Sequence, residues 1–293
     1  MSCKTLVAAT LAATLLIAPA AFAQNSTANL RVIGLTTDSH LVSFGSGSPR
    51  LSQRDIGTVF GLSGGDTFLI GIDFRIQDSQ LYGVGNAGGV YLLNTSNATA
   101  LLINRLALAD GTPVALQGTR FGVDFNPAAD RLRVVSDSGQ NLRHNVNPGG
   151  FTVVDGELNN GAVPPVVVAG VTSIAYSNND VSPDTGTLLF DVNATAGALQ
   201  LQLPANAGTL SLIGTLGFTA DAIVLPALGR GGFDIYTQLD RDGHTVGNAG
   251  FAALTTFAGS QIYSIDLSSG LATDIGSLRT GTTLVDLALP PKQ

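Results

Sequence analysis

Four aspartates recur at matching positions along the chain, and their spacing is the first sign of possible chemistry. They are the third residues of the similar runs GIDF, GVDF, GFDI and LVDL, namely Asp73, Asp124, Asp234 and Asp286. Carboxylates from several segments can hold a cation or cleave a glycosidic bond. Repetition favours a structural interpretation, because a catalytic group needs one distinct environment whereas packing roles recur in every copy. Ala175 occupies the fifth equivalent position, which argues against a complete metal-binding ring.

A second group of polar side chains lies in the run DRLRVVSDSGQNLR at 130–143. Guanidinium and amide groups at this density could hold a carboxylate, a phosphate or sugar hydroxyls. The alternative is a turn at 137–139 stabilised by local hydrogen bonds. The residues that we predict for ligand binding, from this run and from the polar run at 178–180, are Arg131, Arg133, Asp137, Gln140, Asn141, Arg143, Asn178, Asn179 and Asp180.

Other catalytic constellations find no support in the sequence. His40, His144 and His244 are scattered without metal-ligand spacing. The single cysteine, Cys3, precedes an apolar segment near the start of the chain. We therefore predict no catalytic residue, no metal ion and no cofactor.

Residues 1–23 have the pattern of a signal peptide. Lys4 is followed by the apolar stretch 6–17 and by the small-x-small site Ala21-Phe22-Ala23. We predict cleavage before Gln24 and export to the periplasm or outside the cell, with an uncleaved membrane anchor as the alternative. No further membrane span is predicted. A net charge of −7 with 14 Lys and Arg excludes sequence-independent binding of nucleic acids.

The elements that would position these residues are short strands. Apolar residues alternate over short runs that end at Gly, Asn, Asp or Pro, which is typical of strands and turns. The repeated runs have their third positions at 73, 124, 175, 234 and 286, so the steps between them are 51, 51, 59 and 52 residues. Each full step contains four strand-like runs, as expected for one blade of a β-propeller.

The two ends of the chain complement each other in this repeat. The segment 283–289 is a first strand without followers, and the segments 30–36, 41–44 and 51–62 are three strands without a first. Their union predicts an all-β propeller of five four-stranded blades, forming one domain over 24–293. Six blades, with an extra first strand at 222–225, and an open β-sandwich or irregular solenoid are the alternatives. The loops 226–231 and 239–248 are candidate partner surfaces, because blade-end loops often carry function.

The runs DRLRVVSDSGQNLR and AYSNND, with FGVDFNP before the first, resemble a bacterial secreted family, the domain of unknown function 4394. The similarity extends over nearly all of the chain after residue 23. It implies a propeller-like β fold and export, and it supplies no activity, catalytic residue or cofactor.

The sequence as a whole predicts an exported, monomeric and non-enzymatic β-propeller that acts as a binding or interaction module. Its partner would be a small molecule, a glycan or an envelope protein. One alternative is a glycoside hydrolase that uses channel aspartates such as Asp124 and Asp234. Another is a passive structural component of the cell envelope.

Overall fold

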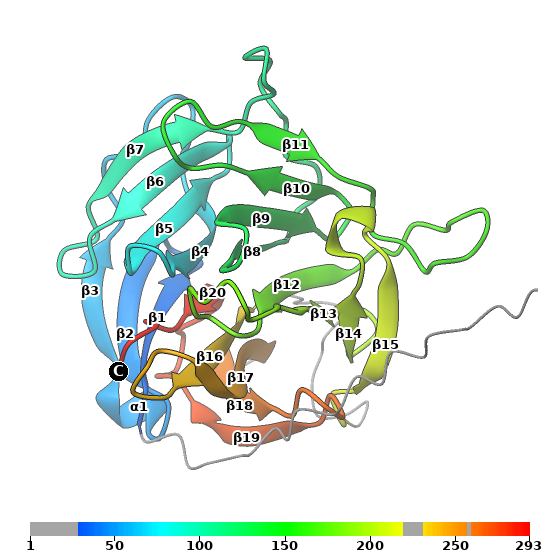
Figure 1. Cartoon of the computed structure of the whole chain (residues 1–293). Coiled ribbons are helices and arrows are strands. Elements are labelled where there is room, and N and C mark those ends of the chain that lie inside the picture. The colour runs from blue at the N-terminus through cyan, green and yellow to red at the C-terminus, as the bar shows by residue number, and fades with distance from the viewer. Residues whose placement is uncertain (1–28, 219–230, 257–258) are drawn as a thin grey trace, which may run out of the picture.

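Alternating short runs form strands because successive side chains point to opposite faces of a sheet. The computed structural model describes residues 29–218, 231–256 and 259–293. Within these residues, strands β1 to β20 form five four-stranded antiparallel sheets. Figure 1 shows the sheets arranged around a centre as the blades of a propeller. The predicted all-β fold with five blades is confirmed.

The strands of each blade follow one another outwards from the centre. Blade 1 contains β20 (Leu284–Ala288), β1 (Arg31–Thr36), β2 (His40–Gly45) and β3 (Arg54–Thr58). Blade 2 contains β4 (Leu69–Arg75), β5 (Gln80–Gly85), β6 (Gly89–Leu93) and β7 (Ala100–Arg105). Blade 3 contains β8 (Phe121–Asn126), β9 (Arg131–Ser136), β10 (Asn141–His144) and β11 (Thr152–Val154). Blade 4 contains β12 (Val171–Tyr176), β13 (Leu189–Asn193), β14 (Ala198–Gln202) and β15 (Leu210–Thr215). Blade 5 contains β16 (Phe233–Leu239), β17 (Thr245–Thr256), β18 (Gly259–Ile265) and β19 (Ala272–Ser277).

The ring is closed by the two ends of the described chain. β20 pairs antiparallel with β1, so that Ala288 lies opposite Ile33 and Asp286 opposite Leu35. This pairing completes blade 1 and covers a strand edge that would otherwise be open. The predicted closure is confirmed, and the strand considered for a sixth blade at 222–225 lies outside the described residues.

The core lies between the blades. Each of five apolar clusters joins two neighbouring blades, an interface that we call a seam and name by its two blades. At the 1–2 seam, for example, Leu35 and Leu41 of blade 1 share a cluster with Ile72 and Tyr91 of blade 2. Burial of apolar surface at the seams holds the blades together.

The local structure differs from the sequence prediction at 51–62 and at 239–248. The segment 51–62 was expected to be one strand, but Pro49 begins the short helix α1 (Pro49–Ser52) and the strand is limited to β3. Proline suits a first helical turn because its fixed φ is helical and the missing N–H has no partner there. The other short helix among the described residues is the 3₁₀ helix η1 (Ala205–Ala207), which lies between β14 and β15.

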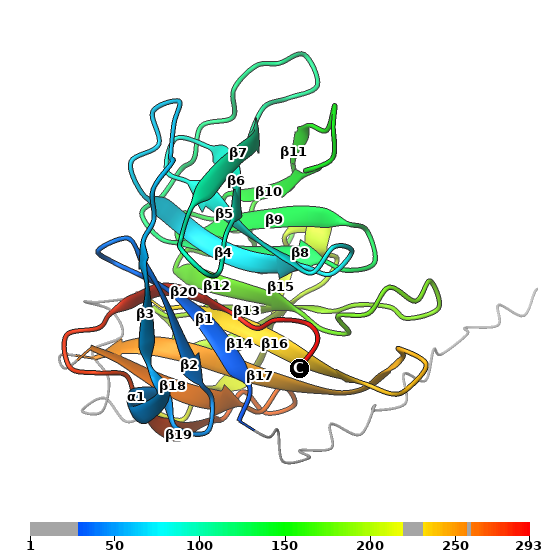
Figure 2. The same cartoon turned by 90° about the vertical axis from the view of Figure 1, so that its left-hand side faces the viewer.

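The predicted loop 239–248 is shorter than expected and covers only 240–244. Leu239 pairs with Thr245, so β16 and β17 continue almost to the tip of a long hairpin, which extends beyond the neighbouring strands in Figure 2. Asp240 closes the tight turn by accepting the backbone N–H of His244 at 2.9 Å. The other expected loop, 226–231, lies outside the described residues except for Gly231, and so does the expected signal peptide 1–23. Among the described residues, no helix has the length and apolar character to cross a membrane.

Candidate functional site

The four repeated aspartates lie buried on the innermost strands, at the axis of the propeller. One carboxylate oxygen from each of Asp73, Asp124 and Asp234 lies within 4.8 Å of the others. Among the described residues, these three carboxylate oxygens are the group spaced closely enough to contact one cation together. Carboxylate oxygens are the ligands that hard cations prefer.

Each of these carboxylates is also a clasp between blades, because it accepts a backbone N–H of the next innermost strand or of the residue just after it. The bonds run from Ile72 to Asp286 at 2.9 Å, from Phe125 to Asp73 at 2.7 Å, from Tyr176 to Asp124 at 3.1 Å and from Leu289 to Asp234 at 2.6 Å. The same bond occurs at the 1–2, 2–3, 3–4 and 5–1 seams. This arrangement supports the structural interpretation of the repeated aspartates.

The glycine two positions before three of the aspartates permits this close approach. A Cβ atom on Gly122 would lie 2.8 Å from the backbone nitrogen of Ile174 and from the Cα of Ser173 in the next blade. A Cβ on Gly232 would meet the backbone nitrogen of Leu287 at 2.2 Å. In the repeated pattern Gly-x-Asp, the glycine lets the backbones of two neighbouring innermost strands approach closely. The aspartate then accepts a backbone N–H across that short distance.

Burial governs the protonation of these carboxyls. It raises the pKa of Asp73 and Asp124 well above the usual range. Repulsion from Asp234 raises the pKa of Asp73 further, and repulsion from Asp73 and Asp234 raises that of Asp124. Burial likewise raises the pKa of Asp286 and that of Asp234, the latter to about 6, against the opposing effect of the backbone N–H bonds. The axis therefore holds protons that exposed aspartates would release.

The 4–5 seam lacks the clasp, because Ala175 replaces the aspartate, and the predicted binding residues 178–180 lie here instead. Asn179 donates its backbone N–H to Thr237 at 2.8 Å and its side-chain amide to the carbonyl of Ile235 at 2.9 Å. Asn178 and Asn248 exchange two hydrogen bonds of 2.9 and 2.7 Å. Asp180 accepts both the backbone N–H and the hydroxyl of Thr245. All three predicted residues thus join β12 to blade 5.

Arg133 is the largest buried polar side chain and lies at the 3–4 seam. Its guanidinium donates to the Tyr176 hydroxyl at 2.6 Å, to Asn206 at 2.7 Å and to Asn141. Arg133 and Arg143 also share the Asp155 carboxylate, at 3.2 and 2.7 Å. Three predicted residues, Arg133, Asn141 and Arg143, are therefore brought together, and most of their polar groups bind one another or the adjoining blade.

Sequence reasoning missed Asp191, which is fully buried on β13 near Arg133. Neither of its carboxylate oxygens has a hydrogen-bond partner among the described residues, and the same holds for the side-chain oxygens of Gln200 and Gln202. Burial raises the pKa of Asp191 well above its usual value, against the attraction of Arg133. An acid inside the apolar run LLFDV was the sequence signal that could have identified it.

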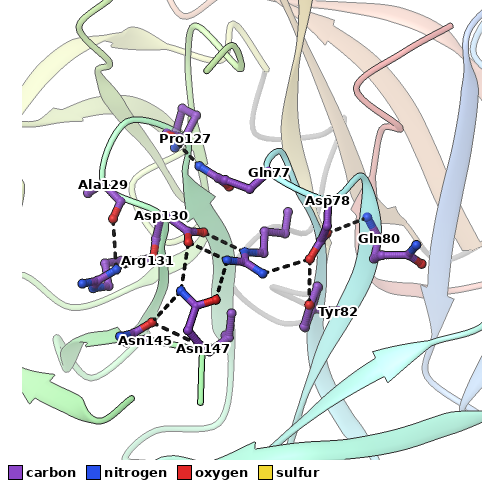
Figure 3. Close-up of polar contacts among 12 residues, drawn as sticks. Gln77, Asp78, Gln80, Tyr82, Pro127, Ala129, Asp130, Arg131, Asn145 and Asn147 are labelled. Atoms are coloured by element: carbon purple, nitrogen blue, oxygen red, sulfur yellow. Dashed lines mark hydrogen bonds and ion pairs between the residues drawn. The ribbon is translucent and has the colours of Figure 1, made fainter. Parts of the chain in front are cut away.

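The 2–3 seam has a second polar contact at the end of β4, shown in Figure 3. The Arg75 guanidinium forms two parallel bonds with Asp130, the Nε bond being 2.7 Å, and further bonds to Asp78 and Asn147. This ion pair lowers the pKa of Asp130. The predicted residue Arg131 donates to the backbone carbonyls of Ala129 and Asp130 in the same turn, at 3.1 and 2.7 Å.

A pocket of about 300 Å³ opens at the end of the propeller where the innermost strands begin. Its wall includes the first residues of several blades, among them Leu69, Phe121, Thr172, Gly231 and Val285. Thr36, Thr37 and Ser39 line it from blade 1, Phe68 from blade 2 and Arg120 from blade 3. We call this the channel-mouth pocket. None of the nine residues predicted from the sequence lines it.

Two of the predicted residues support the loop that carries Arg120. Asp137 accepts the backbone N–H and the hydroxyl of Thr119, at 2.8 and 2.7 Å. Gln140 accepts the N–H of Gln117 at 2.9 Å and donates to the carbonyl of Ala115, also at 2.9 Å. These contacts fix the backbone that enters β8, so they position the Arg120 side chain at the pocket.

Among solved structures, the chain is similar to a protein of unknown function from Bacteroides thetaiotaomicron, with 12% identity, a TM-score of 0.45 and coverage of 91% of this chain and 66% of that one. It is also similar to TolB from Acinetobacter baumannii, with 12% identity, a TM-score of 0.41 and coverage of 90% and 67%. An auxiliary nutrient binding protein from Bacteroides thetaiotaomicron is 12% identical to the chain at a TM-score of 0.44, with coverage of 87% of this chain and 63% of that one.

The chain spans 52% of the hydrazine synthase chain from Kuenenia stuttgartiensis, which is 12% identical to it at a TM-score of 0.39. At such identities and TM-scores the likeness extends to no ligand or activity. No curated protein matches the chain. The sequence profile of one family matches residues 40–288, and the chain therefore belongs to the family described as the domain of unknown function DUF4394.

Proposed function

We propose that the protein is an exported, non-enzymatic binding module that takes a small molecule into the channel-mouth pocket. The observation that carries this proposal is the pocket itself, a cavity of about 300 Å³ at the end of the propeller where the innermost strands begin. Small-molecule sites in proteins are concave, largely preformed and lined by apolar surface with a few polar groups.

The lining has both components. Phe121 and the half-exposed Phe68 supply aromatic surface, while the hydroxyls of Thr37, Ser39 and Thr172 make no hydrogen bond to other described residues. The wall comes from all five blades, and their mutual packing keeps its shape without a ligand. A preformed pocket binds with little loss of conformational entropy.

The alternative of a glycoside hydrolase receives no support from the axial aspartates. An acid and a nucleophile or base must flank the scissile bond, with carboxyls about 5–9.5 Å apart. Oxygens of Asp124 and Asp234 lie within 4.8 Å of each other, both residues are only 2% exposed, and each carboxylate accepts a backbone N–H of the next blade.

The test of the binding proposal is a pocket-blocking variant screened against a panel of small metabolites and oligosaccharides by thermal shift. Thr37→Trp places a bulky ring at the exposed rim of the pocket, and we expect it to abolish any shift seen with the wild type. Ser96→Trp is the matched control, because Ser96 is exposed in the β6–β7 turn at the opposite end of blade 2. Equal shifts in the wild type and Thr37→Trp would refute binding in this pocket.

Export is proposed from the composition of residues 1–23. Fractionation of cells that produce the full chain, followed by N-terminal sequencing of the mature form, tests it. We expect protein outside the cytoplasm beginning at Gln24. A cytoplasmic protein that retains residues 1–23 would be evidence against this part of the proposal.

A further inference from the structure

We infer that the channel-mouth pocket selects small ring-shaped organic acids and that Arg120 binds their carboxylate. This inference rests on the proposed function and names the class of ligand for that same pocket. Its basis is the state of the Arg120 guanidinium, the one charged group among the described residues that line the pocket.

The donors of Arg120 are incompletely used. Its Nε is buried and has no hydrogen-bond partner among the described residues. Its Nη1 lies 3.8 Å from the nearest Asp137 oxygen, which is too far for a hydrogen bond. The guanidinium therefore makes no hydrogen bond to a described residue, and its terminal N–H groups, on a side chain that is 30% exposed, are open to an acceptor in the pocket.

The geometry of a guanidinium matches a carboxylate. The two Nη groups each direct one N–H outwards in parallel, so the end of the guanidinium can bind both oxygens of one carboxylate without contact to the buried Nε. The nearest protein acid does not take this place, because Asp137 accepts two bonds from Thr119. A carboxylate ligand would complete the Arg120 donors with the strong, charge-assisted type of hydrogen bond.

The surrounding charges permit an anion. Apart from Arg120, the lining consists of Thr, Ser, Phe, Leu, Ile, Val and Gly. Asp38, next to the lining residue Thr37, accepts the hydroxyl of Thr36. The axial carboxyls deeper in the propeller have raised pKa values through burial, which reduces their negative charge. Arg120 is therefore the one positive charge on the described lining, and the nearest carboxylate to it, that of Asp137, lies 3.8 Å from its Nη1.

The size and the remaining walls define the body of the ligand. Phe68 is 47% exposed at the rim, and Phe121 forms the wall at the start of β8. Aromatic faces pack against the flat or apolar face of a ring, and the free hydroxyls of Thr37, Ser39 and Thr172 can bind polar substituents. A ring that bears one carboxylate meets both conditions, whether it is an aromatic acid or a sugar acid.

Calorimetric titration at neutral pH with two matched pairs of probes tests the inference. The pairs are benzoate with benzyl alcohol and glucuronate with glucose, so that each acid has a neutral counterpart of similar shape. We expect at least one acid to bind about tenfold more tightly than its counterpart. The two pairs distinguish an aromatic acid from a sugar acid.

Variants at Arg120 locate the effect. Arg120→Gln removes the charge at similar length, and we expect it to weaken binding of the acid by about 10- to 100-fold. Arg54→Gln is the matched control, because Arg54 is exposed on β3 and does not line the pocket. Arg120→Lys keeps the charge but lacks the planar guanidinium, so we expect an affinity for the acid between those of the wild type and Arg120→Gln. If circular dichroism shows that Arg120→Gln does not fold, Arg120→Lys takes its place in the test.

Two results would overturn the inference. In the first, an acid and its neutral counterpart bind equally well, Thr37→Trp abolishes this binding and Arg120→Gln leaves it unchanged. The proposed function would then stand without selectivity for anions. The other is the absence of binding by either acid at about 10 mM. In that case a panel ligand whose thermal shift Thr37→Trp removes would still support the pocket as a binding site.

Discussion

The 4–5 seam differs from the other four in how its polar groups meet. At the four, a buried aspartate on an innermost strand accepts a backbone N–H of the next blade. At the 4–5 seam, Ala175 occupies that position, and Asn178, Asn179 and Asp180 reach across from the end of β12. At the 4–5 seam, hydrogen bonds farther from the axis therefore take the place of the bond between an axial aspartate and the next strand. The difference limits the number of carboxyls crowded at the centre.

The largest expected effect comes from the close approach that the clasp requires. Gly122→Ser adds a side chain against the backbone of Ser173 and Ile174, so the 3–4 seam must open. We expect a loss of about 3 kcal/mol or more in the free energy of unfolding, measured by urea denaturation. Gly186→Ser is the matched control, because a Cβ there meets nothing within 4 Å. Similar losses in both variants would contradict the proposed tightness of the seam.

The 4–5 seam can be weakened by removing its own polar contact. Asp180→Ala leaves the N–H and hydroxyl of Thr245 and the N–H of Ser182 without their acceptor. We expect a loss of about 2 kcal/mol in chemical denaturation, because three hydrogen bonds to one charged acceptor in a part-buried site are lost. Asp184→Ala removes an exposed acid from the same loop and should change little. An equal loss in the two would show that Asp180 does not join the blades.

The clasps also predict that the stability of the protein depends on pH. Burial raises the pKa of Asp234 from 3.8 to about 6, so the folded state holds a proton that the unfolded state has released. Stability from this proton is greatest near pH 4 and is lost as the pH rises through about 6. Asp234→Asn keeps a side-chain oxygen acceptor but cannot titrate.

We therefore expect the stability of Asp234→Asn relative to the wild type to increase by about 1 to 2 kcal/mol between pH 4 and pH 7, measured by denaturation at each pH. His144, whose pKa burial lowers to about 4, contributes a slope of opposite sign in both proteins, so it cancels in the difference. Parallel curves for the two proteins would show that Asp234 is already ionised in the folded state.

The smallest expected effect concerns Asp191, the buried acid on β13 that has no hydrogen-bond partner among the described residues. Asp191→Asn removes the cost of keeping a buried carboxyl protonated, and its amide can donate to Gln200, which lies directly opposite in the β13–β14 pairing. We expect a gain of about 1 kcal/mol in stability at neutral pH that disappears near pH 4. Asp184→Asn, at an exposed site, serves as the control. A loss of stability would show that the Asp191 charge is used.

The architecture could be predicted from the sequence because its signals repeat. The Gly-x-Asp runs occur at steady steps, and the incomplete ends of the chain complement each other. The errors at 51–62 and 239–248 arose where local details decide the structure: the start of a helix at Pro49, and pairing that continues to Leu239 and Thr245. Repetition carries no information about such single events.

The channel-mouth pocket could not be predicted for a related reason. Its lining residues come from the starts of strands about fifty positions apart, and Arg120 belongs to none of the motifs. The sequence predicts ligand binding for Arg133, Asn141 and Arg143 because they lie close together in the chain. In the structure they cluster because they bind one another and share Asp155.

The pairing of β20 with β1 has a consequence for how the protein is made. The Asp286 clasp joins residues 214 positions apart, and blade 1 has no innermost strand until β20 has been synthesised. The ring cannot close before β20 has been synthesised, and contacts so distant in sequence slow folding. For the proposed export this delay is favourable, because a chain that has not yet closed can still be threaded through a narrow membrane channel.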